Sequence, residues 1–203
     1  MPDSKIIHVV DDDADVRQAL AFLLGTAGYT VRVHESALAF LEVLSEVRGG
    51  CVVTDIRMPG MDGLELQRRL RAQAVGLPVI VMTGHGDIPL AVEAMKLGAV
   101  DFIEKPFDDD TMLNAINFAL ERHRTDSKRQ SQIAEIRTRI EALSGRERDV
   151  FGGLVAGKAN KVIAYDLGIS PRTVEVYRAN VMTKMGAESL SELVRMAMMA
   201  GQG

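Results

Sequence analysis

The sequence has a single cysteine, no long apolar run and no strong positive charge, and each shortage excludes a class of protein. Cys51 alone cannot form an intramolecular disulfide or a thiolate zinc cluster, and its place in an apolar run predicts a buried, inert thiol. No apolar run approaches the roughly 20 residues that a membrane-spanning helix needs, and the N-terminus lacks a signal-peptide profile. We therefore expect a cytoplasmic protein that does not contact a membrane.

The charge is unevenly distributed along the chain. Residues 1–124 hold 12 basic and 19 acidic side chains, a net charge of −7, whereas residues 141–203 hold 8 and 7, a net charge of +1. The acidic part suits a cation site, and the mildly basic part does not by itself indicate nucleic-acid binding. The length of 203 residues and the hydrophobic content of 47% are typical of a protein with one or two folded domains.

Two apolar runs lead directly into acidic residues. Residues 6–10 precede the acidic triplet 11–13, and residues 51–54 precede Asp55, which a loop rich in Pro and Gly follows. Short apolar runs bounded by such turns predict buried strands. Carboxylates at the ends of neighbouring strands would repel one another, and such a site would relax by protonation or by holding a hard divalent cation. The alternative is that the triplet caps a helix, since acidic residues favour first turns.

Strand-like runs alternate with helical patterns about a dozen residues apart, which predicts a parallel sheet with crossover helices. Five such units in residues 1–124 predict a doubly wound, flavodoxin-like α/β domain. In that topology the first and third strands lie side by side, where such sheets carry their functional residues. One of the predicted helices is capped by Ser36 and would bury Leu38, Leu41, Leu44 and Val47.

Two further strand ends point to the same edge of the sheet. Thr83 ends the fourth predicted strand and Lys105 ends the fifth. Taken singly, Thr83 is an ordinary strand residue and Lys105 a solvated charge. Together with the carboxylates, a hydroxyl and an ammonium form a set that suits phosphoryl transfer to Asp55.

The residues at these strand ends resemble the signature of the receiver domain of two-component response regulators: Asp11, Asp12, Asp55, Thr83 and Lys105-Pro106. The resemblance covers about residues 1–124 and implies a CheY-like receiver that accepts a phosphoryl group on Asp55 from a sensor histidine kinase. It also implies a Mg²⁺ ion, whose ligands would be Asp11 or Asp12, Asp55 and the backbone carbonyl of Arg57.

The same resemblance implies how phosphorylation changes the domain. Phe102 resembles the family's switch aromatic, whose burial changes with Thr83, although the sequence alone indicates an ordinary core residue of a strand. A phosphoryl group would pull Thr83 and the glycine-rich loop 84–87 toward the site. The family generally dimerises through the surface formed here by residues 88–104, so we expect a homodimer after phosphorylation.

Residues 125–140 connect the receiver to the rest of the chain. Few Pro or Gly residues occur in 111–143, which predicts a helical linker. Apolar residues in this stretch also follow the spacing of a coiled-coil seam, although two heptads are too few to establish one. Self-association of the linker is therefore a hypothesis that depends on Ile133, Ile136, Ile140 and Leu143.

Residues 141–203 have the pattern of a small all-α domain. Ser144 and Glu147 have the spacing of a capping box, and Ser170 precedes a helix with Pro171 in its first position. A helix, a short Gly-containing turn and a second helix form the helix-turn-helix pattern. The inward face of the second helix would consist of Val174, Val181 and Met185.

The opposite face of that helix exposes a valine and an alanine among polar groups. Such a face suits the major groove of DNA, where apolar groups meet thymine methyls and a glutamate accepts from cytosine. We expect Lys161, Arg172 and Lys184 to bind phosphates. The alternative is a plain amphipathic helix in a four-helix domain. The remaining candidate DNA contacts are Thr173, Glu175, Val176, Ala179 and Asn180.

The second domain resembles the LuxR-type helix-turn-helix of the NarL/FixJ response regulators. The matching residues are Leu143-Ser144-x-Arg146-Glu147, Gly157-Lys158-x-Asn160-Lys161-x-Ile163-Ala164 and Leu167-Gly168-Ile169-Ser170-x-Arg172-Thr173-Val174. Similarity to the rhizobial members of this family implies an activator of nitrogen-fixation genes that is phosphorylated by a FixL-like, oxygen-sensing haem kinase. The low basicity indicates weak binding by a monomer, so dimerisation would supply affinity through paired half-sites.

Two other classes of function compete with this interpretation. A stand-alone phosphotransfer or hydrolytic enzyme would need a second acid/base group or a substrate pocket, and neither is visible in the sequence. A degenerate receiver that serves only as an interaction module would not need Asp55, Thr83 and Lys105 together. We therefore expect a regulator whose only chemistry is its own phosphorylation and dephosphorylation.

Overall fold

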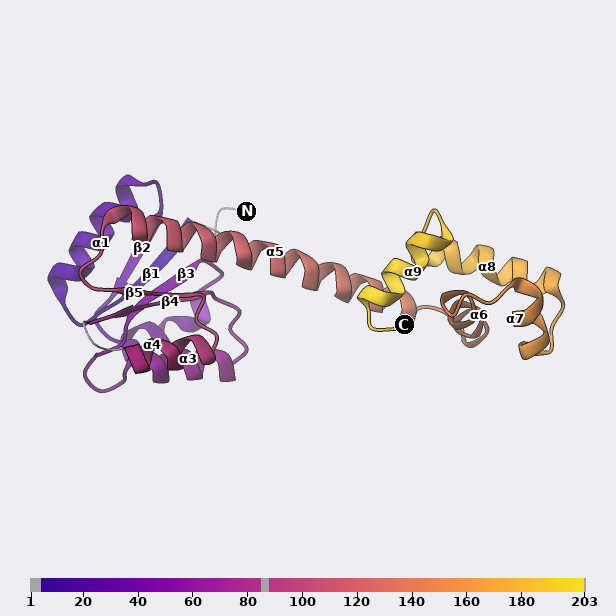
Figure 1. The fold of residues 1–203 in the computed structure, drawn as a ribbon, viewed down its shortest axis with the longest axis horizontal. Coiled ribbons are helices and arrows are strands. Elements are labelled where there is room, and N and C mark those ends of the chain that lie inside the picture. Colours follow the sequence, from indigo (N-terminus) through magenta and orange to yellow (C-terminus); the bar gives the residue numbers. More distant parts are fainter. Residues whose placement is uncertain (1–4, 85–87, 203) are drawn as a thin grey trace. The chain divides into compact units, whose positions relative to one another are not determined.

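The computed structural model describes residues 5–84 and 88–202, and these residues divide between Thr125 and Asp126 into two compact units. No helix in the described ranges is long and apolar enough to cross a membrane. The elements are β1 (Ile6–Val10), α1 (Ala14–Thr26), β2 (Thr30–His34), α2 (Ala37–Glu42), a 3-10 turn (Leu44–Glu46), β3 (Cys51–Asp55), α3 (Gly63–Ala72), β4 (Val79–Thr83), α4 (Ile88–Lys96), β5 (Asp101–Glu104), α5 (Asp109–Glu141), α6 (Gly145–Val155), α7 (Asn160–Leu167), α8 (Pro171–Met185) and α9 (Leu190–Met199) (Figure 1).

The first unit contains a five-stranded sheet in the order β2-β1-β3-β4-β5, with every neighbouring pair parallel. All residues of β3 and β4 are buried, which explains their nearly continuous apolar sequences. The predicted doubly wound α/β fold is therefore confirmed, including the adjacency of the first and third strands.

Helices cover both faces of this sheet, and each side has its own apolar core. On one side, Leu20 and Leu24 of α1 pack with Met112 and Ile116 of α5. On the other side, the buried apolar residues come from α2, α3 and α4. Figure 1 shows α1 and α5 on the face of the sheet opposite to α3 and α4. Both faces are thereby closed, and the strand ends carry the polar groups that lie at the edge of the domain.

The helix that follows Ser36 is shorter than predicted. Ser36 caps it as expected, accepting from the N–H of Ala39 at 3.1 Å, but α2 ends at Glu42 and a 3-10 turn follows. Leu38 is 51% exposed, whereas Phe40 is fully buried. The predicted apolar face is therefore wrong for Leu38 and omits Phe40, whereas Leu41, Leu44 and Val47 pack against the core although the helix does not continue to Val47.

The second unit is helical, with one apolar core shared by α6, α7, α8, α9 and the C-terminal part of α5. Residues 125–140 are helical within α5, as the predicted linker requires. Ile136, Ile140 and Leu143 are 7%, 8% and 3% exposed and pack into this core. These side chains therefore belong to the core of the second unit, and the coiled-coil hypothesis loses three of its four seam residues.

Candidate functional site

The neighbouring strands β1 and β3 bring two acidic residues to one edge of the sheet. Their register pairs Val10 with Thr54, so Asp11 and Asp55 come next at the carboxyl ends of the two strands. Asp11 is 1% exposed and Asp55 is 8% exposed. Carboxylates that are so deeply buried need charged or hydrogen-bonding partners, because desolvation disfavours the ionised form.

Lys105 is the shared partner of both carboxylates. Its Nζ atom donates to Asp11 Oδ2 at 2.9 Å and to Asp55 Oδ1 at 2.5 Å. Lys105 directly follows β5, and its backbone N–H donates to the carbonyl of Thr83 at the end of β4, at 2.7 Å. The peptide bond that follows, to Pro106, is cis. The ends of β1, β3, β4 and β5 therefore meet at one place.

Burial and ion pairing have opposite effects on the pKa values of Asp55 and Lys105. Burial raises the pKa of the Asp55 carboxyl, and the hydrogen bond from Lys105 only partly opposes that rise. Burial also disfavours the charged form of Lys105, but its bonds to Asp55 and Asp11 outweigh burial and raise the pKa of the ammonium. The second carboxylate oxygen of Asp55 accepts from the N–H of Arg57 at 2.6 Å. Asp55 is thus held at both oxygens by donors.

The acidic triplet after β1 divides into three different roles. The Asp11 side chain accepts from the N–H of Asp13 at 2.9 Å, and Asp13 caps α1 by accepting from the N–H of Asp15 at 2.8 Å. Asp12 is exposed. Within residues 5–84 and 88–202, no group of three His, Cys, Asp or Glu side chains is gathered as a metal site. The capping interpretation therefore holds for Asp13, whereas Asp11 is buried and Asp12 is exposed.

The predicted switch residues lie on adjacent strands. Thr83 is 3% exposed at the end of β4, and the register places it opposite Glu104 of β5. Phe102 is 45% exposed on β5, so its interpretation as an ordinary core residue is wrong. Residues 85–87 of the predicted glycine-rich loop lie outside the described residues.

The surface formed by residues 88–104 contains exposed apolar side chains on α4 and β5. Val92 and Met95 of α4 are 48% and 41% exposed, and Phe102 of β5 has a similar exposure. Ala91 and Ala94 face inward, at 2% and 0%. The sequence did not distinguish these groups; the structure assigns Val92 and Met95 to the surface, while Leu90 and Leu97 pack against the core.

One residue near the acidic pair was missed by the sequence analysis. Arg17 of α1 donates from Nη1 to the backbone carbonyl of Asp11 at 2.7 Å. It lies one turn after the cap residue Asp13, where a long side chain can reach back over the start of the helix. A basic residue in the first turn, where acidic residues are favoured, was the available indication.

In the second unit, α7 and α8 form the predicted helix-turn-helix. Gly168 ends α7 in a left-handed conformation with φ of 65°, and Ser170 caps α8 by accepting from the N–H of Thr173 at 3.1 Å. The turn thus requires a glycine, because other residues are strained at positive φ. The predicted inward residues of α8 are all fully buried: Val174, Val181 and Met185.

Most of the candidate DNA contacts are exposed. Val176 is 58% exposed on α8, and Thr173 is partly buried with its hydroxyl 2.8 Å from that of Ser170. Lys184 is bonded to another side chain: its Nζ atom donates to Glu147 Oε2 at 2.7 Å. The other exposed candidates are Lys161, Arg172, Glu175, Ala179 and Asn180.

The capping box at the start of α6 is also confirmed, and it has a further contact. Glu147 accepts from the N–H of Ser144 at 2.7 Å as well as from Lys184. The bond from Lys184, with the one from Ser144, lowers the pKa of Glu147 from 4.5 to about 2. The sequence predicted Glu147 only as a cap and Lys184 only as a phosphate contact.

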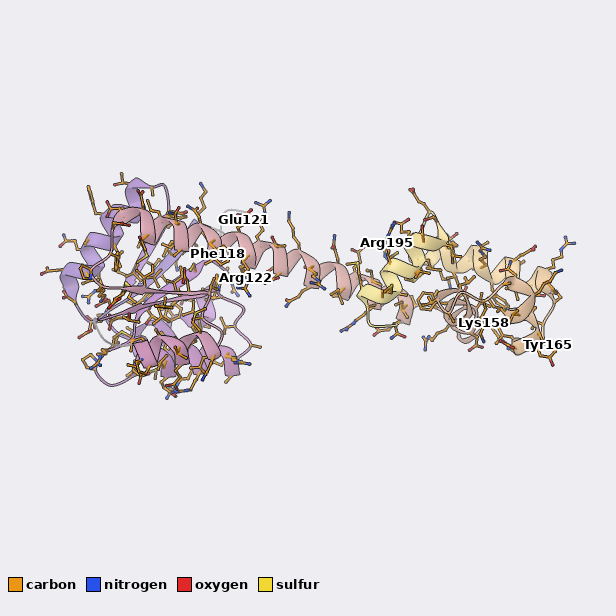
Figure 2. All side chains as sticks on the ribbon, in the orientation of Figure 1. Phe118, Glu121, Arg122, Lys158, Tyr165 and Arg195 are labelled. Atoms are coloured by element: carbon orange, nitrogen blue, oxygen red, sulfur yellow. The ribbon has the colours of Figure 1, made fainter. Side chains whose placement is uncertain are left out.

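The exposed face of α7 has an aromatic residue that the sequence analysis did not single out. Tyr165 is 88% exposed on α7 and is labelled in Figure 2. Lys158 is paired with Asp166 of α7 at 2.7 Å. Asp166 partly neutralises the charge of Lys158. Lys161, on α7, is exposed.

Comparison with known proteins places both units in described families. Residues 7–117 match the response regulator receiver domain, and residues 141–197 match the bacterial regulatory proteins of the luxR family. The chain is 59% identical to the transcriptional regulatory protein FixJ of Azorhizobium caulinodans, over 99% of this chain and 95% of that protein. It is 54% identical to FixJ of Rhizobium meliloti, over 97% of each chain.

Solved structures give the same result. A crystal structure of full-length FixJ from B. japonicum is 55% identical and covers 98% of each chain, with a TM-score of 0.63. The structure of the response regulator StyR is 40% identical and covers 95% of this chain and 98% of that one, with a TM-score of 0.83.

Proposed function

This chain belongs to the two-component response regulators with a LuxR-type DNA-binding domain, and from that premise we propose that Asp55 is its phosphorylation site. It is a transcription activator and not a stand-alone enzyme. The observation that carries the proposal is the buried Asp55 carboxylate at the end of β3, held by Lys105 and by the N–H of Arg57. A nucleophilic carboxylate in such a place can take a phosphoryl group while an adjacent ammonium neutralises the added charge.

Receiver domains generally bind Mg²⁺, and the residues of this chain fit such an ion. The hard oxygen donors that Mg²⁺ prefers are available in two buried carboxylates, Asp11 and Asp55, which share a single ammonium. We propose Asp11, Asp55 and the backbone carbonyl of Arg57 as ligands, with the exposed Asp12 close in sequence to complete the set. When bound, the ion neutralises negative charge on the phosphoryl oxygens.

The chain's own residues then have separate roles. An Asp55 carboxylate oxygen attacks the phosphorus of the kinase's phosphohistidine and forms an acyl phosphate, while the P–N bond breaks and the histidine imidazole leaves. The Lys105 ammonium stabilises the phosphoryl oxygens. The Thr83 hydroxyl donates a hydrogen bond to the phosphoryl group, which draws the end of β4 toward the site. Phe102, now exposed on the neighbouring strand, fills the space that Thr83 leaves. This couples the chemistry at Asp55 to the surface of residues 88–104.

We propose that this surface forms a phosphorylation-dependent homodimer. Support comes from the exposed Val92, Met95 and Phe102, which offer apolar area that a dimer would bury. Dimerisation would align two effector domains on paired half-sites, which raises affinity without new contacts. That gain is needed because residues 141–203 have a net charge of only +1.

In the DNA-bound state we propose that α8 occupies the major groove. Glu175, Val176, Ala179 and Asn180 would contact base edges, while Lys161, Arg172 and Thr173 would hold phosphates. The exposure of Val176 supports this role. Lys184 is the weakest member of the set, because its ammonium is bonded to Glu147. We also propose a cytoplasmic location, where such a regulator meets DNA and its kinase.

We further propose nitrogen-fixation genes as targets and a FixL-like sensor histidine kinase as the phosphoryl donor. The support is the 54–59% identity, over nearly the full length, with three proteins named FixJ. A histidine kinase partner and DNA follow already from the two domains, whereas the identity of the kinase is the finer proposal.

The proposed function is tested by sedimentation of the full chain with Mg²⁺, with and without beryllofluoride, which mimics a phosphoryl group on aspartate. We expect a shift from monomer to dimer that requires beryllofluoride and is absent in Asp55→Asn. Asp62→Asn, an exposed residue of the following loop, is the matched control and should shift normally. An identical oligomer in all samples would contradict the proposal.

A further inference from the structure

The C-terminal end of α8 is bonded to a side chain of the linker segment. Arg139, on α5, donates from Nη1 to the backbone carbonyl of Met185 at 2.7 Å. Met185 is the last residue of α8, and the last carbonyls of a helix have no partner further along the same helix. A guanidinium at this end also interacts favourably with the helix dipole.

The residue after Met185 is shaped to admit this guanidinium. Gly186 has a φ of +64°, a conformation that side-chain-bearing residues adopt with strain. A Cβ atom at Gly186 would lie 2.8 Å from Arg139 Nη1, which is too close for a real contact. The glycine therefore does two things at once: it ends α8 in a left-handed turn, and it leaves room for the bond to Arg139.

Arg139 has a second partner on its own helix and lies next to buried residues of the second unit. Its Nη2 atom donates to Glu135 Oε1, one turn earlier on α5, at 2.6 Å. The residues on either side of it in the helical pattern, Ile136 and Ile140, are buried in the same core as Met185. The bond to Met185 therefore joins the end of α8 to a residue that lies beside the buried face of α5.

A second contact ties the same end of α8 to α6. Lys184 is bonded to Glu147, the buried cap residue of α6, so two consecutive residues of α8 have partners on two different helices. Val174 and Val181 fix α8 against the core, but apolar packing alone allows a helix to slide or rotate slightly about its axis. The polar contacts at residues 184 and 185 specify its position along and around that axis.

We propose that Arg139 is a positioning residue for DNA recognition, which sets the position of α8 through the carbonyl of Met185. The inference rests on the proposed function, in which α8 is the recognition helix. Base contacts require hydrogen-bonding geometry, so a small displacement of α8 weakens specific binding and leaves phosphate contacts largely unchanged. Arg139 acts through Met185 and does not touch the DNA.

The test compares Arg139→Met, which keeps the aliphatic stem, with Arg137→Met, an exposed arginine of the same helix. Both variants lose one charge, so their non-specific affinities fall alike. The probes are a duplex selected from a random library by the wild-type protein with Mg²⁺ and beryllofluoride, and a scrambled duplex of the same composition. Affinities are measured with full-length chains at a temperature where thermal unfolding shows the second unit to be folded.

We expect the ratio of specific to non-specific affinity to fall about tenfold in Arg139→Met relative to Arg137→Met, comparable to one lost base contact. Arg139→Lys, which retains a cationic donor, should recover part of the loss. The amide resonance of Gly186 should shift in Arg139→Met and stay in place in Arg137→Met, because its peptide contains the Met185 carbonyl. If Arg139→Met does not fold, Arg139→Lys carries the comparison alone.

A ratio in Arg139→Met within about twofold of that in Arg137→Met would overturn the inference; where only Arg139→Lys folds, the same result in Arg139→Lys would overturn it. The failure of the proposed recognition face gives a different result. In that case Glu175→Ala and Val176→Ala would also leave the ratio unchanged, which would overturn both proposals. If these two variants reduce the ratio and the Arg139 variants do not, only the positioning role of Arg139 is wrong.

Discussion

Lys105 and Asp55, 50 positions apart in the chain, are joined by a hydrogen bond of 2.5 Å from ammonium to carboxylate. The same ammonium reaches Asp11, so one positive charge serves two buried negative ones. With one ammonium for two carboxylates, the site lacks positive charge even before a phosphoryl group is added. That shortage defines what the site can accept: a divalent cation first, and then a phosphoryl group whose oxygens Lys105 can share.

The first prediction concerns Lys105. Replacing it by Met should slow phosphorylation of Asp55 by about 10²-fold, the usual cost of removing one donor that stabilises developing charge. The rate is measured by intact-mass spectrometry after addition of acetyl phosphate and Mg²⁺. Lys96→Met, at the exposed end of α4, is the control and should react at the wild-type rate. A normal rate in Lys105→Met would remove Lys105 from the reaction.

A change at Thr83 should affect dimerisation but not the phosphorylation of Asp55. Thr83→Ala lacks the hydroxyl that would bond to the phosphoryl group, but it leaves Asp55, Asp11 and Lys105 in place. We expect phosphorylation within about threefold of wild type and a strong loss of the beryllofluoride-dependent dimer. Thr83→Ser retains the hydroxyl and should dimerise. Sedimentation of both variants measures dimerisation. Thr83→Ala that dimerises as well as wild type would contradict the proposed role of the Thr83 hydroxyl.

The pair Glu147–Lys184 predicts a pH dependence of stability in the second unit. The pKa of Glu147 is lowered from 4.5 to about 2 in the folded chain by its bonds to Lys184 and Ser144. Its contribution is therefore complete above pH 4.5 and is lost as the pH falls from 4.5 toward 2. Glu147→Gln should lower the unfolding temperature of this unit at pH 6, and the difference from wild type should shrink below pH 4.5. The control is Glu175→Gln, an exposed residue of α8.

The comparison for Glu147→Gln is made on thermal unfolding curves recorded at several pH values. A constant difference between wild type and Glu147→Gln across that range would show that the pair does not contribute through ionisation. A variation of the same size in Glu175→Gln would assign the effect to general charge.

The apolar residues of the linker segment supply a stability prediction. Ile136 is 7% exposed within the core of the second unit, so Ile136→Ala should destabilise this unit by about 2–5 kcal/mol. Ile133 is only partly buried, and Ile133→Ala should cost clearly less. Denaturant unfolding measures both. Equal costs, together with a loss of self-association, would restore the coiled-coil interpretation.

The acidic and basic strand ends could be predicted from the sequence for a simple reason. In a parallel sheet the carboxyl ends of all strands meet at one edge, so each residue that follows a strand is placed by topology alone. Asp11, Asp55, Thr83 and Lys105 all met in this way. Topology does not specify which member of a run of three acidic residues turns inward, and the sequence left Asp11 and Asp12 equivalent.

Other features depended on tertiary packing that the sequence does not display. Helical spacing predicted that Leu38 is buried, but Leu38 is 51% exposed and Phe40 is fully buried. Phe102 has the sequence context of a core strand residue and is exposed because its side of β5 is not covered. Linker residues with coiled-coil spacing pack instead into the second unit. In each case the sequence showed that apolar residues are regularly spaced, but not which surface they pack against.

The long-range polar contacts were the least predictable. Arg139 and Met185 are 46 positions apart, and Lys184 and Glu147 are 37 apart. The capping box with Ser144 was a sufficient reason for a glutamate at position 147, so a second partner for its side chain was not expected. Gly186 was the one available indication, because a glycine at the end of a helix marks a turn, but not the space for a guanidinium.

Every role proposed for the strand ends depends on the transfer of a phosphoryl group to Asp55, which intact-mass spectrometry detects. Full-length wild type, Asp55→Asn and Asp62→Asn are incubated with acetyl phosphate and Mg²⁺ and measured at acidic pH. The account predicts a mass gain of one phosphoryl group in wild type and Asp62→Asn, and none in Asp55→Asn. A phosphoryl group on Asp55→Asn, or none on wild type, would contradict it.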